Sequence, residues 1–128
     1  MKYAILLVII TLAGNAFGQE LDCKTFHNGK FLLENTEIGN TIIERKGDVH
    51  TEYVENLGIK INFKIKWIND CTCRLEVREI VKNPNQIEFP KDIIFTIEIV
   101  ETKEQSYIQS TTSNFSDYAF KSEILKIE

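Results

Sequence analysis

The strongest constraint on the fold of this chain is the regular alternation of apolar and polar residues between Ile59 and Val77. Successive side chains of a β-strand point to opposite faces, so the alternation predicts strands with one buried face and one wet face. The pattern breaks at Asn69–Cys71, which predicts a hairpin turn. The residues expected on the inward face of this hairpin are Ile59, Ile61, Phe63, Ile65, Trp67, Cys73, Leu75 and Val77.

The register of the hairpin follows from these two faces, because directly opposed residues of paired strands share a face. A two-residue loop would set Trp67 opposite Thr72 and mix apolar with polar side chains. A three-residue loop, Asn69–Cys71, sets Trp67 opposite Cys73. A slip of one residue would move every apolar side chain into water, so we predict the three-residue loop.

Short alternating runs continue on both sides of the hairpin, separated by turn residues every 8–12 positions or so, as is typical of all-β proteins. Strands are expected at 31–33, 41–45, 49–54, 93–101 and 107–112, and the segment 118–127 fits a helix or a strand. We favour a strand there, because the preceding segments all predict antiparallel sheet. The expected fold is an up-and-down meander of about seven to eight strands, closed into a barrel-like or strongly curved sheet, since closure removes exposed edges. A two-sheet sandwich is the alternative.

The first 18 residues differ from the rest of the chain. Lys2 is their only charge, residues 4–13 are nearly all apolar, and Ala16 and Gly18 are small. This predicts a secretory signal peptide cleaved after Gly18, with a single domain from Gln19 to Glu128. The apolar run is shorter than the ~20 residues that span a bilayer, so we expect no stable membrane anchor after cleavage. The expected location is the periplasm or the extracellular space.

Cysteine usage agrees with export, since disulfides form in oxidising compartments. Cys71 and Cys73 are two apart in a strand, where their side chains diverge. Cys73 also has the alternation of a core residue and is expected to be buried and reduced. We therefore predict a disulfide between Cys23 and Cys71, worth about 2–4 kcal/mol in the chain-entropy account.

The net charge and the absence of known sequence motifs argue against several classes of function. Loss of Lys2 with the leader changes the formal net charge from −4 to about −5, which disfavours a nucleic-acid partner. His27 and His50 belong to no spaced set of metal ligands, so neither a metal nor another cofactor is expected. Nucleophile elbows, phosphate loops and redox motifs are absent from the sequence. We expect no enzymatic activity.

Two segments carry a resemblance: Cys-Lys-Thr-Phe-His-Asn-Gly-Lys-Phe from Cys23 to Phe31, and Lys-Trp-Ile-Asn-Asp-Cys from Lys66 to Cys71. With a basic residue followed by glutamate between Ile43 and Glu52, they resemble a group of small exported β-rich proteins of Bacteroidetes-type bacteria. Some of these proteins carry a DNA topoisomerase IV label, which does not suit a short, acidic, exported chain. The group usually has an aromatic residue where Cys73 stands. The resemblance implies an exported β-domain and supplies no site residues.

The function expected from the sequence is that of a non-enzymatic exported module, which binds an unknown protein or a small apolar ligand. One alternative is a carrier of lipocalin-like shape, and an enclosed apolar cavity of ~300 Å³ or more would favour it. A small enzyme with a cysteine and histidine site is the second alternative. The residues expected either to line such a cavity or to fill the core are Phe63, Ile65, Trp67, Leu75, Phe95 and Ile97.

Overall fold

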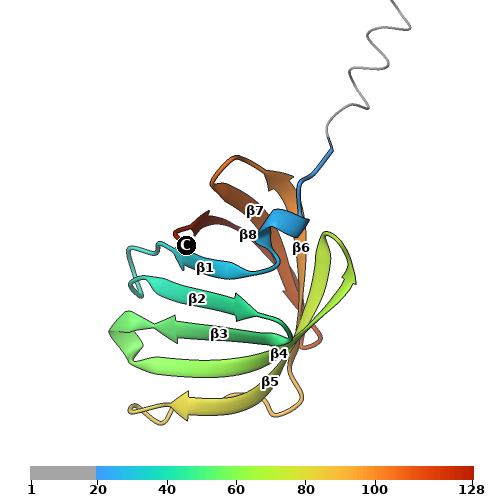
Figure 1. Ribbon diagram of the computed structural model, residues 1–128. Helices are drawn as coiled ribbons and strands as arrows, with labels where there is room; N and C mark the ends of the chain where they lie inside the picture. Colours follow the sequence, from blue (N-terminus) through green and yellow to red (C-terminus); the bar gives the residue numbers. More distant parts are fainter. Residues whose placement is uncertain (1–19) are drawn as a thin grey trace, which may run out of the picture.

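The computed structural model describes residues 20–128, which form eight antiparallel strands closed into a barrel (Figure 1). Each strand pairs with the next along the chain, and the last pairs with the first. The predicted up-and-down barrel is therefore confirmed, and the alternative sandwich is not formed. The expected signal peptide and the mature start at Gln19 lie outside the described residues.

The eight strands differ in length and are joined by tight turns and by two longer connections, 34–40 and 83–93. The strands are β1 (Gly29–Leu33), β2 (Thr41–Lys46), β3 (Val49–Val54), β4 (Ile59–Asn69), β5 (Thr72–Lys82), β6 (Ile94–Thr102), β7 (Ser106–Ser113) and β8 (Ser116–Lys126). Two short 3₁₀ turns accompany them, η1 (Lys24–Phe26) before β1 and η2 (Glu55–Leu57) between β3 and β4. Neither turn was predicted from the sequence. Within residues 20–128, no helix has the length and apolar character needed to cross a bilayer.

The central hairpin has the predicted register, but the predicted three-residue loop is wrong: Asn69 pairs with Thr72, and a bulge between Trp67 and Asn69 keeps the register. Trp67 lies opposite Cys73 and Ile65 opposite Leu75, so the alternating apolar residues from Ile59 to Val77 share the inward face. The sequence 118–127, which fitted either helix or strand, lies almost entirely in β8. Pairing of Phe31 with Lys126 closes the barrel. This pairing joins only Phe31 and Leu32 to β8, so closure covers the edges of the two strands at that position.

One end of the barrel is covered by η1 (Figure 1). Phe26 of η1 is fully buried, and a disulfide joins Cys23 to Cys71 in the β4–β5 turn, with the two Cα atoms 5.2 Å apart. Trp67 is half-buried and stacks on the ring of His27, with the ring centroids 3.6 Å apart. The predicted disulfide is confirmed, and this end of the barrel is closed.

The buried apolar residues form two clusters. The first lies under η1 and consists of Cys23, Phe26, Phe31, Ile43, Ile99, Tyr107 and Ile124. The second follows β4, β5 and β6 and consists of Ile59, Ile61, Phe63, Ile65, Cys73, Leu75 and Ile97. Trp67 packs against both clusters. The first cluster fills the closed end, while the second forms one wall of the remaining interior.

Candidate ligand-binding cavity

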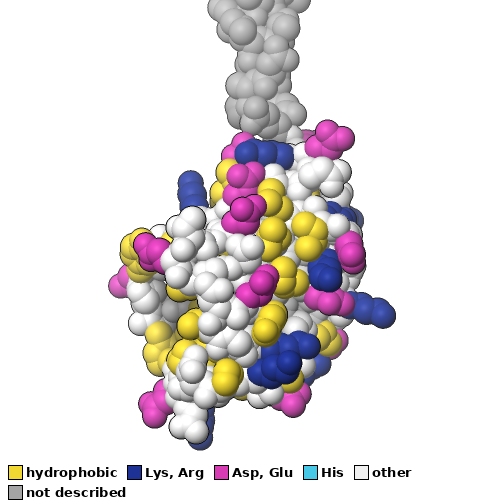
Figure 2. Space-filling model, turned by 90° about the vertical axis from the view of Figure 1, so that its left-hand side faces the viewer, with side chains coloured by type: hydrophobic (Ala, Val, Ile, Leu, Met, Phe, Trp, Pro, Cys, Tyr) yellow, Lys and Arg dark blue, Asp and Glu magenta, His cyan; other side chains and the backbone are white. Residues whose placement is uncertain are grey.

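The barrel encloses a cavity of about 870 Å³ that opens at the end opposite η1. Its rim includes η2 and the connections between β1 and β2 and between β5 and β6. Figure 2 views the molecule from the side on which η2 lies and shows apolar side chains between charged ones. The apolar residues that line the cavity are Leu33, Ile38, Val54, Leu57, Ile59, Ile61, Phe63, Leu75, Val77, Ile87, Phe89, Ile93, Phe95, Ile97, Phe120 and Leu125.

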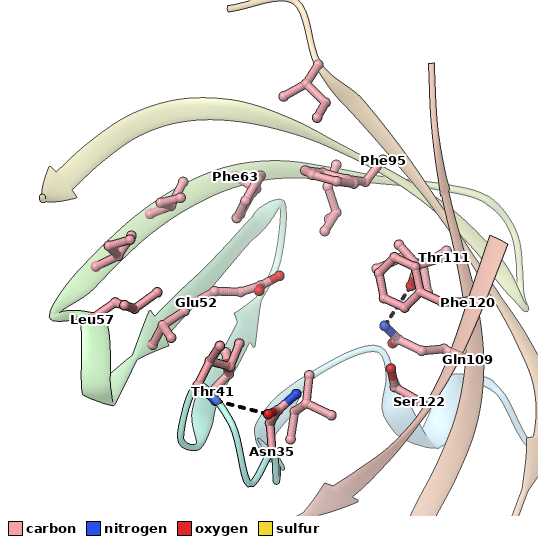
Figure 3. A pocket seen from close by; sticks show the side chains of 18 of the residues that line it. Asn35, Thr41, Glu52, Leu57, Phe63, Phe95, Gln109, Thr111, Phe120 and Ser122 are labelled. Carbon is pink, nitrogen blue, oxygen red and sulfur yellow. Dashed lines mark hydrogen bonds between the residues drawn. The ribbon is translucent and has the colours of Figure 1, made fainter. Parts of the chain in front are cut away.

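The residues expected to line a cavity or fill the core divide between these two roles. Four of the six reach the cavity: Phe63, Leu75, Phe95 and Ile97. Phe63 and Phe95 meet edge to face, with ring centroids 6.1 Å apart (Figure 3). Ile65 is buried in the second cluster, and Trp67 packs between the clusters near the closed end. Neither lines the cavity, because both lie nearer the β4–β5 turn than Phe63 does.

A buried arginine makes hydrogen bonds to residues of the closed end and of the barrel interior. Arg45 of β2 is only 2% exposed, although an arginine is rarely buried without partners. Its guanidinium donates hydrogen bonds to the Phe26 carbonyl at 2.9 Å, the Tyr107 hydroxyl at 2.7 Å and His50 Nδ1 at 3.1 Å. It also lies 4.9 Å from the centroid of the Phe31 ring and 5.5 Å from that of Tyr107, distances that suit cation–π attraction.

His50 extends this chain of contacts toward the cavity. Arg45 can only donate, so His50 Nδ1 must accept, and the ring carries its proton on Nε2. Nε2 donates to the Glu52 carboxylate across 2.8 Å. Burial lowers the pKa of His50, which is fully buried, and so favours the neutral ring. The imidazole therefore lies as a neutral link between a cation and an anion.

Glu52 is the last residue in this series of hydrogen bonds, and its side chain lines the cavity (Figure 3). Burial alone would raise its pKa, but the hydrogen bond from His50 and nearby positive charge outweigh that effect. The pKa of Glu52 consequently lies below its ordinary value, and the carboxylate is ionised at neutral pH. Its side chain is 30% exposed, whereas that of His50 is fully buried. Glu52 thus presents a negative charge to an otherwise mostly apolar space.

A second polar group lies on the opposite wall. Strand β7 is four strands away from β3 in either direction around the barrel. Its Gln109 is 7% exposed and donates through Nε2 to Thr111 Oγ1 at 3.1 Å (Figure 3). Gln109 Oε1 is buried and has no hydrogen-bond partner among the described residues. Such an unpaired acceptor costs about 1–3 kcal/mol, and native proteins contain few of them.

The groups considered for catalysis do not converge. Burial raises the pKa of the Cys73 thiol to about 11, so it stays protonated at neutral pH. Cys71 is held in the disulfide. His27 lies at the closed end, where its Nε2 is 2.7 Å from the Asp70 carbonyl. Within residues 20–128, no group of three or more histidine, cysteine or acidic side chains is arranged to hold a metal ion.

Sequence reasoning missed Arg45, His50, Glu52, Tyr107 and Gln109. A signal was present, since Arg45 has the same alternation as Ile43, and Glu52 the same as His50 and Val54. Alternation alone therefore places charged side chains of two neighbouring strands inside the barrel. It does not show that they are paired, because the partners Tyr107 and Phe26 come from distant parts of the chain.

Comparison with known proteins adds nothing to this description, since no family model, curated protein or solved structure matches the chain. The resemblance to exported β-rich proteins stays a prediction. Function must be argued from the site itself, which is an apolar cup with an ionised carboxylate and an unpaired amide oxygen.

Proposed function

We propose that this protein binds a small apolar molecule inside its barrel and acts as a non-enzymatic carrier. The observation that carries the proposal is the cavity of about 870 Å³, whose walls are mainly aliphatic and aromatic. Ligand pockets commonly have volumes of roughly 300–1,000 Å³, apolar walls and a few polar groups that orient the ligand. Eight-stranded barrels either are filled by their own side chains or hold one small ligand. The open interior supports the second case.

The interior of this barrel is not filled by its own side chains. Unfilled apolar volume forfeits packing contacts and so lowers stability. Meanwhile, Ile38 and Ile87 are exposed at the rim, and Phe120 lines the cavity while remaining half exposed. A module that acts only through its outer surface has no use for such an arrangement. A carrier uses it to admit and hold an apolar ligand.

A periplasmic or extracellular place of action is part of this proposal. The intramolecular disulfide is consistent with an oxidising, exported compartment. The apolar leader predicted for residues 1–18 supports the same location. A carrier there would move a poorly soluble molecule through an aqueous space.

A protein-interaction module is the second candidate. It is favoured by exposed aromatic residues on the β7–β8 hairpin, where Phe115 is 58% and Tyr118 71% exposed. Tyr118 and Phe120 stack with their ring centroids 6.3 Å apart. Exposed apolar patches commonly mark interaction sites. This hairpin lies beside the cavity, so a partner protein bound here could also receive the ligand.

The test is titration of the purified, disulfide-bonded protein with N-phenyl-1-naphthylamine, a neutral apolar dye that fluoresces in dry surroundings. We expect saturable binding of one dye per protein. Val77→Phe places a ring in the cavity and should weaken binding at least tenfold, because Val77 lines the cavity wall. Val81→Phe is the matched control, since Val81 lies on the same strand but is 40% exposed outside the cavity.

This comparison requires that both variants remain folded. Thermal unfolding of each variant checks that they do. Absence of saturable dye binding would contradict the carrier proposal. Equal weakening by Val77→Phe and Val81→Phe would contradict it too, because it would place the dye outside the barrel.

A further inference from the structure

We propose that the cavity selects ligands whose polar end donates hydrogen bonds and carries positive charge, such as a primary alkylamine, and rejects carboxylates. This inference rests on the proposed carrier function and specifies its ligand class. It comes from the two polar groups of the cavity floor, Glu52 and Gln109, both of which offer acceptors.

The barrel topology places these two groups at one level. β3 and β7 both begin at the closed end and run toward the mouth, because each follows a turn at the closed end. Arg45 bonds His50 of β3 and Tyr107 of β7, which fixes those two residues in one layer. The next inward residue toward the mouth is two positions on in each strand. Those residues are Glu52 and Gln109, which therefore face each other one layer above Arg45 (Figure 3).

Both groups have acceptor capacity that the described residues leave unused. Among the described residues, the hydrogen bond to the Glu52 carboxylate comes from His50 and is made to Oε2. Gln109 Oε1 is buried and unpaired. An ammonium group has three N–H donors and a positive charge, so it can pair with the Glu52 carboxylate and keeps N–H groups for a second acceptor. An alcohol supplies only one donor and no charge.

Arg45 does not reverse this preference. Its hydrogen bonds go to His50, the Phe26 carbonyl and Tyr107, all away from the cavity. The neutral ring of His50 stands between Arg45 and Glu52, so an anionic ligand would meet the ionised carboxylate first. The Glu52 side chain is only 30% exposed, so solvent screens such a like-charge contact incompletely and the contact is unfavourable. The other charged residues of the cavity lining, Glu34, Lys121 and Glu123, are exposed, so solvent screens them.

The test uses three ligands of equal chain length: decylamine, decanol and decanoate. Each is titrated at pH 7.5 against bound N-phenyl-1-naphthylamine, below the concentration at which it forms micelles. For the unaltered protein we expect decylamine to bind at least tenfold tighter than decanol, and decanoate to bind at least tenfold weaker than decanol. Glu52→Gln should bring the three affinities to within about threefold of one another, because it removes the charge and keeps an acceptor for His50.

Two further variants complete the design. Glu44→Gln makes the same chemical change on the exposed outer wall and should leave all three affinities unaltered. Gln109→Leu removes the unpaired oxygen and should weaken decylamine and decanol by about threefold to tenfold, with little effect on decanoate. Gln109→Leu therefore tests the polar groups of the cavity floor independently if Glu52→Gln fails to fold.

The outcomes separate the two proposals. If the dye binds but decanoate competes as well as decylamine in the unaltered protein, the ligand class is wrong and the carrier function stands. An affinity order that survives both Glu52→Gln and Gln109→Leu would also overturn the assignment. If the dye does not bind at all, both proposals fail.

Discussion

Replacing Arg45 with methionine should destabilise the barrel severely, because this one side chain connects η1, β3 and β7. The substitution preserves much of the side-chain volume, so little of the effect comes from a cavity. What is lost is a set of hydrogen bonds to Phe26, Tyr107 and His50. A hydrogen bond to a charged group contributes about 1.5–3 kcal/mol, and an acceptor left buried and unpaired costs about 1–3 kcal/mol.

These contributions are not additive, and methionine recovers some apolar contact with the surrounding rings. Removing one member of a buried charged network typically costs about 3–5 kcal/mol. We expect that loss for Arg45→Met, which is a large part of the roughly 5–15 kcal/mol that holds a domain folded. Arg45→Lys should lose nearly as much, since an ammonium cannot reproduce the fork that serves three separated acceptors.

The assay is equilibrium unfolding in urea, followed by circular dichroism and by the emission of Trp67, the single tryptophan. Arg74→Met is the matched control, because Arg74 is exposed on the outer face of β5 and should lose less than about 0.5 kcal/mol. Tyr107→Phe should cost about 1–3 kcal/mol alone and much less in the Arg45→Met background, since both changes remove the same Arg45–Tyr107 hydrogen bond. A cost below about 1 kcal/mol for Arg45→Met would refute the reasoning.

Other consequences of the structure can be measured in the same preparations. The lowered pKa values of His50 and Glu52 mean that the unfolded chain binds more protons than the folded one on acidification. Thermal stability should therefore fall below pH 6.5 as His50 charges in the unfolded state, and again below pH 4.5 for Glu52; His50→Gln should remove the first decline. Replacing Cys23 and Cys71 together with serine should lower the free energy of unfolding by about 2–4 kcal/mol, seen in urea titrations without reductant. Iodoacetamide should leave Cys73 unmodified in the folded protein and alkylate it in urea, and rapid labelling without denaturant would contradict its burial.

The sequence predicted the barrel because alternation fixes which side chains face inward, and facing residues fix the register. Trp67 opposite Cys73 follows from that logic alone. The turn η1 could not be predicted, since three residues carry too little periodicity and its position depends on the Cys23–Cys71 disulfide. The cavity could not be predicted either. Alternation places Phe63 and Phe95 inside the barrel, but whether inward side chains meet or leave space depends on the curvature of the whole sheet.

The buried hydrogen-bonded series Arg45–His50–Glu52 shows a second limit of sequence reasoning. Arg45 and Glu52 follow the inward alternation, yet a charged residue in a strand is usually exposed, so residue type argues against what the alternation predicts. Their burial is compensated by partners in other strands. Tyr107 is 62 residues from Arg45 in sequence, so this pairing becomes visible only once the strands are placed.

The central claim is that the barrel interior holds an apolar ligand. Its most direct test is methyl NMR of the protein with labelled isoleucine, leucine and valine, titrated with N-phenyl-1-naphthylamine. We predict saturable shifts for methyl groups that line the cavity, such as those of Ile61, Leu75 and Ile97, with outward-facing Ile68 and Val81 unmoved. Shifts confined to Ile68, Val81 and other outer residues, or no saturable shift at any methyl group, would contradict the claim.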